Sequence, residues 1–216
     1  MKYRILSAAL GAAVIASTAS AQVCQGDLSF RGRPTHIVGS FGTTDHTTNF
    51  GGGAVFGHAQ GLYGGGSLGL MDIDGFNGNS IILGGGVGYS MPVGRRNEWQ
   101  VCPGATLSLG FGPSVNVGAT SERFSSQTFT GGASIGRALA VNKDFTLLPF
   151  GSAALGHTSQ HLANASASDN YLLLGFGAGL QFSPNWVIRP AITVAAGADL
   201  IDDTTFGLSL SWALPR

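Results

Sequence analysis

The sequence predicts an all-β protein, a single antiparallel up-and-down β-barrel of ten strands that crosses a membrane, with eight strands as the alternative. Three observations favour this fold class. Side chains alternate with a period of two near the C-terminus, the residues opposite the large apolar side chains are small, and only 10% of the 216 residues are charged. Soluble domains usually contain about 25% charged residues, so this chain has few side chains suited to a water-exposed surface.

The alternation is clearest over residues 171–182. Large apolar side chains there alternate with glycines: Leu172, Leu174 and Phe176 against Gly175, Gly177 and Gly179. Residues 186–196 and 204–214 repeat the scheme, and their polar faces hold mainly Ala, Ser, Thr and Gly with one charge, Arg189. A soluble sandwich would place larger, charged residues on its outer face. Small residues on one face and large apolar ones on the other suit a narrow barrel surrounded by lipid.

The N-terminus predicts a secretory signal peptide over residues 1–21. Lys2 and Arg4 precede an apolar run at residues 5–16, and small residues precede the expected cleavage after Ala21. We expect residues 22–34 to form an N-terminal periplasmic segment or a partial plug, and residues 35–216 to form the barrel. No later stretch holds about 20 consecutive apolar residues, so a helical membrane protein is not expected.

Ten candidate strands follow in order. Their mean length approaches the roughly 9–11 residues that a tilted strand needs to cross the hydrocarbon layer. The first two show the weakest alternation, because Gly51–Gly53 blur the two faces. An eight-stranded barrel would require the loss of one of these two and one other strand. The expected strands are residues 35–43, 47–57, 62–71, 80–91, 98–111, 127–139, 145–157, 171–182, 186–196 and 204–214.

Short and long connections alternate along the chain. Residues 58–61, 92–97, 140–144 and 183–185 are short, whereas residues 72–79, 112–126, 158–170 and 197–203 are longer and polar. The short connection at residues 44–46 falls on the same side as the long set. This pattern is typical of periplasmic turns and external loops.

Six aromatic residues lie at the short-turn ends of the expected strands. An amphipathic ring is stable where apolar and aqueous regions meet, so we interpret these residues as an aromatic girdle at the membrane interface. The alternative is that they are ordinary core aromatics. The girdle residues are Tyr89, Trp99, Phe145, Phe182, Trp186 and Trp212.

These features, with the closing residues Phe206-Gly-Leu-Ser-Leu-Ser-Trp212-Ala-Leu214, resemble the small outer-membrane β-barrel proteins of Gram-negative-type bacteria, the OmpA-like and opacity-protein-like transmembrane barrels. The resemblance implies an integral location in the cell outer membrane after Sec-type export. It implies contact with outer-membrane lipids, lipopolysaccharide and the barrel assembly machinery, and most often eight strands. Members usually end in an aromatic residue, whereas this chain ends Leu214-Pro215-Arg216, so Trp212 is the nearest substitute.

Cys24 and Cys102 predict one disulfide, because an even cysteine count in an exported protein favours pairing. By alternation Cys102 faces inward near a short-turn end, and Cys24 enters from the same side. A bridge would hold residues 22–34 as a partial plug and would stabilise the fold by about 4 kcal/mol in the chain-entropy model. Unpaired thiols are the alternative.

Arg189 and Glu98 are expected to face the lumen near the same end. An unpaired charge in a narrow lumen is costly unless water reaches it, so one hypothesis pairs Arg189 with Glu98 or Asp27. The alternative is a solvated Arg189 that lines a small pore.

The most enzyme-like group is His157 and Ser159, with His161 and Asp169 nearby. An imidazole beside a hydroxyl, oriented by a carboxylate, is what acyl hydrolysis needs. The spacing is similar to the His-x-Ser of outer-membrane lipid A deacylases, but Gln160 stands where that family has Asn, and Asp169 at best replaces its Glu. We therefore expect no catalysis.

The sequence thus predicts an integral outer-membrane β-barrel with a structural, surface-interaction or narrow-pore role that is not an enzyme. The alternatives are a lipid A-modifying acyl hydrolase and a secreted soluble β-sandwich binding protein. The five histidines are scattered, so we assign no metal and no cofactor. A formal net charge of zero gives no electrostatic reason to expect nucleic acid, and a partner for the external loops is left open.

Overall fold

The computed structural model describes residues 23–28, 34–58, 60–74, 78–94, 98–117, 120–162, 165–201 and 204–214. For residues 113–117, 120–122 and 162 it describes the backbone alone. The predicted signal peptide, residues 1–21, lies outside these residues, as do residues 22 and 29–33 of the predicted plug segment. Within the described residues no helix has the length and apolar character needed to cross a bilayer. The elements are η1 (Val23–Gln25), β1 (Thr35–Thr43), β2 (Thr47–Gly57), β3 (Leu62–Ile73), β4 (Ser80–Tyr89), β5 (Met91–Val93), β6 (Trp99–Val117), β7 (Thr120–Gly136), β8 (Leu139–Ala140), β9 (Thr146–Leu162), β10 (Ala165–Ser183), β11 (Trp186–Ala196) and β12 (Thr204–Ala213).

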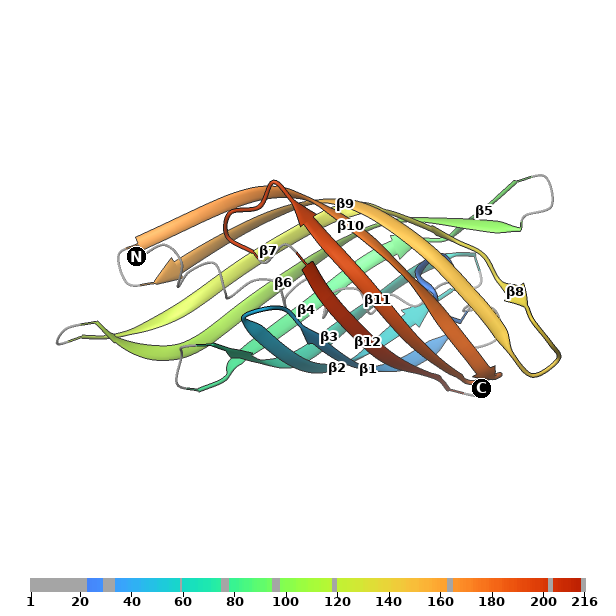
Figure 1. The fold of residues 1–216 in the computed structure, drawn as a ribbon, viewed down its shortest axis with the longest axis horizontal. Helices are drawn as coiled ribbons and strands as arrows, with labels where there is room; N and C mark the ends of the chain where they lie inside the picture. The colour runs from blue at the N-terminus through green and yellow to red at the C-terminus, as the bar shows by residue number, and fades with distance from the viewer. Residues whose placement is uncertain are drawn as a thin grey trace.

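Ten of these strands form one closed antiparallel barrel, as the sequence predicted. Around the barrel the order is β1-β2-β3-β4-β6-β7-β9-β10-β11-β12, and β12 pairs back onto β1 from His36↔Ala213 to Thr43↔Phe206. The alternative of eight strands is therefore wrong. The two short strands β5 and β8 pair with β6 and β9 at the end that carries the short turns (Figure 1).

The two faces of the wall differ as the alternation predicted. Along β12 the outward residues are large and exposed, whereas the inward residues are small and mostly buried. The same holds for β10, where Phe176 points outward with 54% of its surface exposed and Gly175 and Gly177 face the lumen. Large apolar side chains therefore cover the outside, and small or hydroxyl-bearing ones line the inside.

Four strands are longer than predicted, and this corrects the assignment of two loops. Residues 112–126 and 158–170 were expected to be polar external loops, but most of them continue the hairpins β6–β7 and β9–β10. Segments rich in serine and threonine usually form loops. Here these residues alternate between the two faces of a sheet that continues past the apolar part of the strands. The strand pairing therefore continues to Val117↔Thr120 in one hairpin and to Leu162↔Ala165 in the other.

The added residues form a four-stranded sheet beyond the barrel, which we call the extension: residues 112–117, 120–128, 157–162 and 165–171. The pairing β7–β9 continues to Ser125↔His161, while β4 last pairs with β6 at Ile81↔Phe111 and β11 last pairs with β10 at Ala196↔Leu172. Figure 1 shows these hairpins reaching past their neighbours at the end opposite β5, β8 and the C-terminus. The extension therefore continues one side of the barrel wall only.

If the outer face meets lipid, Phe176→Arg lowers the free energy of unfolding by about 2–4 kcal/mol, the cost of an arginine at mid-membrane depth. The measurement is urea unfolding in phospholipid vesicles. Val141→Arg is the control, because exposed Val141 lies in the turn between β8 and β9 and should change stability little. Equal losses for the two variants would contradict a lipid-facing Phe176.

Candidate functional site: a plugged lumen

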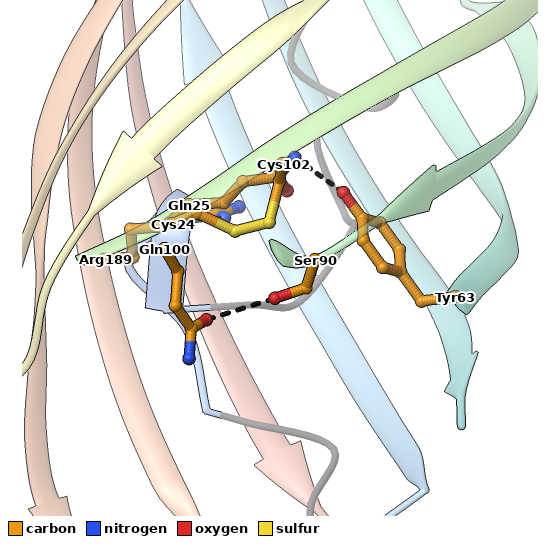
Figure 2. The surroundings of a disulfide bond; sticks show 7 residues. All are labelled: Cys24, Gln25, Tyr63, Ser90, Gln100, Cys102 and Arg189. Atoms are coloured by element: carbon orange, nitrogen blue, oxygen red, sulfur yellow. Dashed lines mark hydrogen bonds between the residues drawn. A yellow bond between two sulfur atoms is a disulfide. The ribbon is translucent and has the colours of Figure 1, made fainter. Parts of the chain in front are cut away.

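The described part of the N-terminal segment lies inside the barrel near the short-turn end. Its 3-10 helix, η1, is held by the disulfide Cys24–Cys102, with 6.0 Å between the two Cα atoms and a sequence separation of 78. Both cysteines are almost fully buried. Figure 2 shows the bridge joining this segment to β6, with Tyr63 of β3 nearby and its hydroxyl in hydrogen-bond contact with the Gln25 amide. The structure thus brings together the two cysteines that the sequence paired.

We call residues 23–28 the plug, because apolar contacts fix them on two sides of the lumen. On one side the disulfide packs with Val38, Val55 and Tyr63. On the other side Val23 and Leu28 pack in a cluster with Leu148, Val187 and Ala213. Burial of these side chains adds to the covalent link, so the plug is a packed part of the barrel interior.

Polar contacts also hold the plug, on the side formed by β11 and β12. Arg189 donates from Nε to the Ser209 hydroxyl at 3.0 Å and from Nη1 to the Gln25 carbonyl oxygen at 3.0 Å. The carboxylate of Asp27 accepts hydrogen bonds from the Ser211 hydroxyl and from the Leu28 amide, each at 2.6 Å. Buried polar groups need such partners, and these bonds tie the plug to β11 and β12.

Arg189 lies in the lumen as predicted, with 8% of its surface exposed, whereas Glu98 does not. Glu98 precedes the first residue of β6 and is exposed, because it belongs to the turn and not to the wall. The negative charge that acts on the guanidinium is that of Asp27 in the plug. The structure therefore favours Asp27 over Glu98 as the electrostatic partner of Arg189.

Two glycines of the wall make room for the plug. A Cβ atom at Gly179 would overlap the carbonyl oxygen of Gly26, and a Cβ atom at Gly136 would overlap the carbonyl oxygen of Val23. Gly26 itself has a φ of 73°, a conformation that favours glycine. From the sequence such glycines are recognisable only as small inward residues, and no sequence signal identifies which of them meet the plug.

Above the plug the lumen contains a cavity of mixed lining with two neighbouring lobes of about 80 and 110 Å³. Gln25 forms part of the floor of both lobes, and Ser134, Ser152 and Thr193 line both. Arg189 lines the smaller lobe. A water molecule occupies about 30 Å³ in the liquid, so this space suits a few waters or a small polar solute.

An apolar cluster closes the lumen on the far side of the cavity. Leu173 belongs both to the cavity wall and to this cluster, so the two are in direct contact. The loop after β11 contributes Ile201 and is tied to β10, because the Asp169 carboxylate accepts hydrogen bonds from the amides of Asp199 and Leu200. We call this cluster the outer seal: Met71, Ile73, Ile82, Phe124, Tyr171, Leu173, Ala195 and Ile201.

The six predicted girdle residues lie at the short-turn end of their strands. Trp186 and Trp212 are paired across β11 and β12 with stacked rings 5.6 Å apart. The guanidinium of Arg137 lies 5.3 Å from the ring centroid of Trp99, a cation–π contact. Tyr89 and Phe182 are exposed, and Phe145, directly before β9, is half-buried. A girdle at a membrane interface stays a prediction for these six residues.

The enzyme-like group is not assembled as hydrolysis would need. His157 Nδ1 is 2.9 Å from Asn170 Oδ1 on the outward face. Asp169 lies one residue earlier, so it faces the other side of the sheet and binds the loop after β11. A carboxylate on the opposite face cannot orient the imidazole. Among the described residues, no three His, Cys, Asp or Glu side chains gather as metal ligands.

The disulfide leads to a stability prediction. The double variant Cys24→Ser with Cys102→Ser should lose about 4 kcal/mol of unfolding free energy, because opening a loop of this length raises the entropy of the unfolded chain. Urea unfolding of the detergent-folded barrel measures the loss. Thiol labelling of denatured, unreduced wild-type protein is the companion measurement, and two labelled cysteines per chain would contradict the bridge.

The glycine contacts lead to a second prediction. Gly179→Val should displace the plug and leave Cys24 and Cys102 accessible to thiol reagents in a large share of the folded molecules, because the new side chain would overlap Gly26. Gly39→Val is the matched control, since no heavy atom lies within 4 Å of a Cβ atom there. Complete oxidation of both variants would show that the plug does not depend on Gly179.

Comparisons with known proteins support the fold. No protein-family model and no curated protein matches the chain. The β domain of the Bordetella autotransporter BrkA is 13% identical, with a TM-score of 0.55, and the match covers 83% of this chain and 98% of that one. The translocator domain of the autotransporter NalP from Neisseria meningitidis is 14% identical with a TM-score of 0.41, covering 85% and 89%.

A further similar structure is Ail, the attachment invasion locus protein of Yersinia pestis, which is 15% identical with a TM-score of 0.37 and coverage of 84% and 99%. Of these three matches, the one to the BrkA β domain has a TM-score above 0.5 and supports the fold. At this identity the likeness concerns the fold alone. The chain shares the antiparallel β-barrel fold of that outer-membrane β domain.

Proposed function

We propose that this chain is an integral outer-membrane protein whose closed barrel acts as a non-conducting anchor and holds the extension at the cell surface. The observation that carries the proposal is the double closure of the lumen. Among the described residues the plug lies at one end of the lumen and the outer seal at the other, with a small cavity between them. A barrel built for free diffusion would leave a continuous polar path.

The length of the extension supports a surface role. Strands β6 and β10 have 19 residues each, whereas β1 and β12 have 9 and 10. A strand of about 10 residues suffices to cross the hydrocarbon layer, so the additional residues serve something outside it. A rigid sheet held by backbone hydrogen bonds presents side chains in fixed positions, as a binding surface requires.

A non-enzymatic role agrees with the arrangement of polar side chains. The imidazole of His157 contacts the side-chain amide of Asn170. Asp169, the next residue on β10 toward the extension, lies on the other face of the sheet and accepts a hydrogen bond from the Asp199 amide. We therefore do not propose lipid hydrolysis. Contact with lipopolysaccharide and delivery by the barrel assembly machinery follow from the proposed location and are part of the same proposal.

A narrow, gated pore is a second candidate, and the cavity is the observation that favours it. Seven hydroxyl-bearing side chains and Arg189 line it beside apolar residues such as Val38 and Phe150. The hydroxyl residues are Ser40, Thr106, Thr130, Ser134, Ser152, Thr193 and Ser209. In that case the outer seal would have to open.

Planar-bilayer recording distinguishes the two candidates. We expect no stepwise conductance from the wild-type protein, because both ends of its lumen are closed. A variant that lacks residues 22–33 and carries Ile201→Ser should conduct, because it removes the plug and weakens the outer seal. Stable conductance steps from wild type would instead support the gated pore.

The location is tested by membrane fractionation together with gel migration of unboiled and boiled samples. Closed barrels commonly stay folded in detergent until they are heated, so we expect the unboiled band to migrate differently. Recovery of the protein in a soluble fraction, without such a shift, would overturn the proposal.

A further inference from the structure

The outward face of the extension differs from the outward face of the barrel below it. On β9, Leu155 is 70% exposed and is followed on the same face by His157, Ser159 and His161. On β10, Leu172 is followed toward the extension by Asn170 on that face. On both strands the outward side chains thus change from apolar to polar at the same position along the barrel axis.

This level coincides with the expected edge of the hydrocarbon layer. From Phe182 to Leu172 the outward face of β10 is apolar over roughly ten residues, about 33 Å along the strand at 3.3 Å per residue. With a strand tilt of about 40°, the height is about 25 Å, which is the usual height of the apolar band. Asn170 and His157 therefore lie where lipid headgroups begin.

The strand register gathers these polar side chains into rows. His157 is paired with Asn170 on one side and with Phe129 on the other. His161 is paired with Ser166 and Ser125 in the same way. Because paired residues on neighbouring strands share a face, the polar side chains form one area across β7, β9 and β10, with Phe129 at its apolar edge.

The charge of this area has one sign. Its ionisable members are His157, His161 and Arg123, all of them exposed. No described carboxylate shares the face, since Asp169 lies on the other side of the sheet. The opposite side of the barrel differs, because exposed Asp72 follows Leu70 on the outward face of β3. An anionic group is therefore favoured beside β7 and β9 and disfavoured beside β3.

The hydrogen bond to Asn170 prepares His157 for an anion. The side-chain oxygen of Asn170 can only accept a hydrogen bond, so His157 Nδ1 carries the proton that it donates. His157 Nε2, on the other side of the ring, points away from Asn170. When Nε2 is also protonated, the imidazolium keeps the bond to Asn170 and can donate from Nε2 to a phosphate oxygen. Gln127 and Arg123 supply further donors on the same face.

We propose that Arg123, Gln127, His157, His161 and Asn170 form a binding site for the phosphorylated headgroup of an outer-leaflet glycolipid whose acyl chains pack on Phe129, Leu155 and Leu172. This site rests on the proposed function, because it requires the barrel to sit in a membrane with the extension at the headgroup level. The occupant follows from continuity: a lipid that covers the apolar band below must place its headgroup against this face.

Native mass spectrometry of the protein released from nanodiscs tests the site. The probes are lipid A with two phosphates and the same lipid A after dephosphorylation, so the acyl chains are equal. The wild-type protein should retain the phosphorylated form about fivefold more tightly, since each basic group near an anionic headgroup contributes favourably. The triple variant Arg123→Gln, His157→Gln, His161→Gln should retain both forms equally.

The matched control is His46→Gln, His58→Gln, Lys143→Gln, which changes the same number of imidazoles and fixed positive charges at exposed positions outside the site. It should keep the preference for the phosphorylated lipid. Equal retention of both lipids by wild type, or an unchanged preference in the triple variant, would overturn the site. Failure of the wild type to insert into nanodiscs would overturn the proposed function itself, which separates the two results.

Discussion

The closure of β12 onto β1 is the constraint on which the rest of the structure depends. In hydrocarbon an unpaired peptide group costs several kcal/mol, so a sheet that enters lipid must have no free edge there. Closure fixes which face of every strand is outside, and the period of two then assigns each side chain to lipid or lumen. The large apolar residues outside and the small ones inside are both consequences of that assignment.

A ten-stranded barrel with small inward residues has an interior that its own wall does not fill. The plug and the outer seal fill it in different ways. At one end, glycines of the wall leave space for backbone from the N-terminal segment, which the disulfide and the Arg189 contacts hold in place. At the other end, larger side chains such as Met71, Ile82 and Phe124 meet across the lumen. The cavity is what remains between them.

The fold could be predicted from the sequence because the alternation is a property of residues read one strand at a time, and the disulfide because the chain has two cysteines and the features of an exported protein. The ends of β6, β7, β9 and β10 could not, because there the outward residues turn polar and a Ser- and Thr-rich strand has the composition of a loop. The choice between Asp27 and Glu98 also escaped prediction. It depends on where the plug lies relative to β11, a long-range contact that no local pattern records.

The same change from apolar to polar outward residues links the missed strands to the function. On the side formed by β7, β9 and β10 the wall continues beyond the apolar band, so in the proposed location one sheet would contact acyl chains below and polar groups above. His157 is exposed and Ser159 is half-buried, both on the outward face, and in the proposed location both would lie near that boundary. A closed lumen leaves this outer surface as the part of the molecule in which specific recognition can occur.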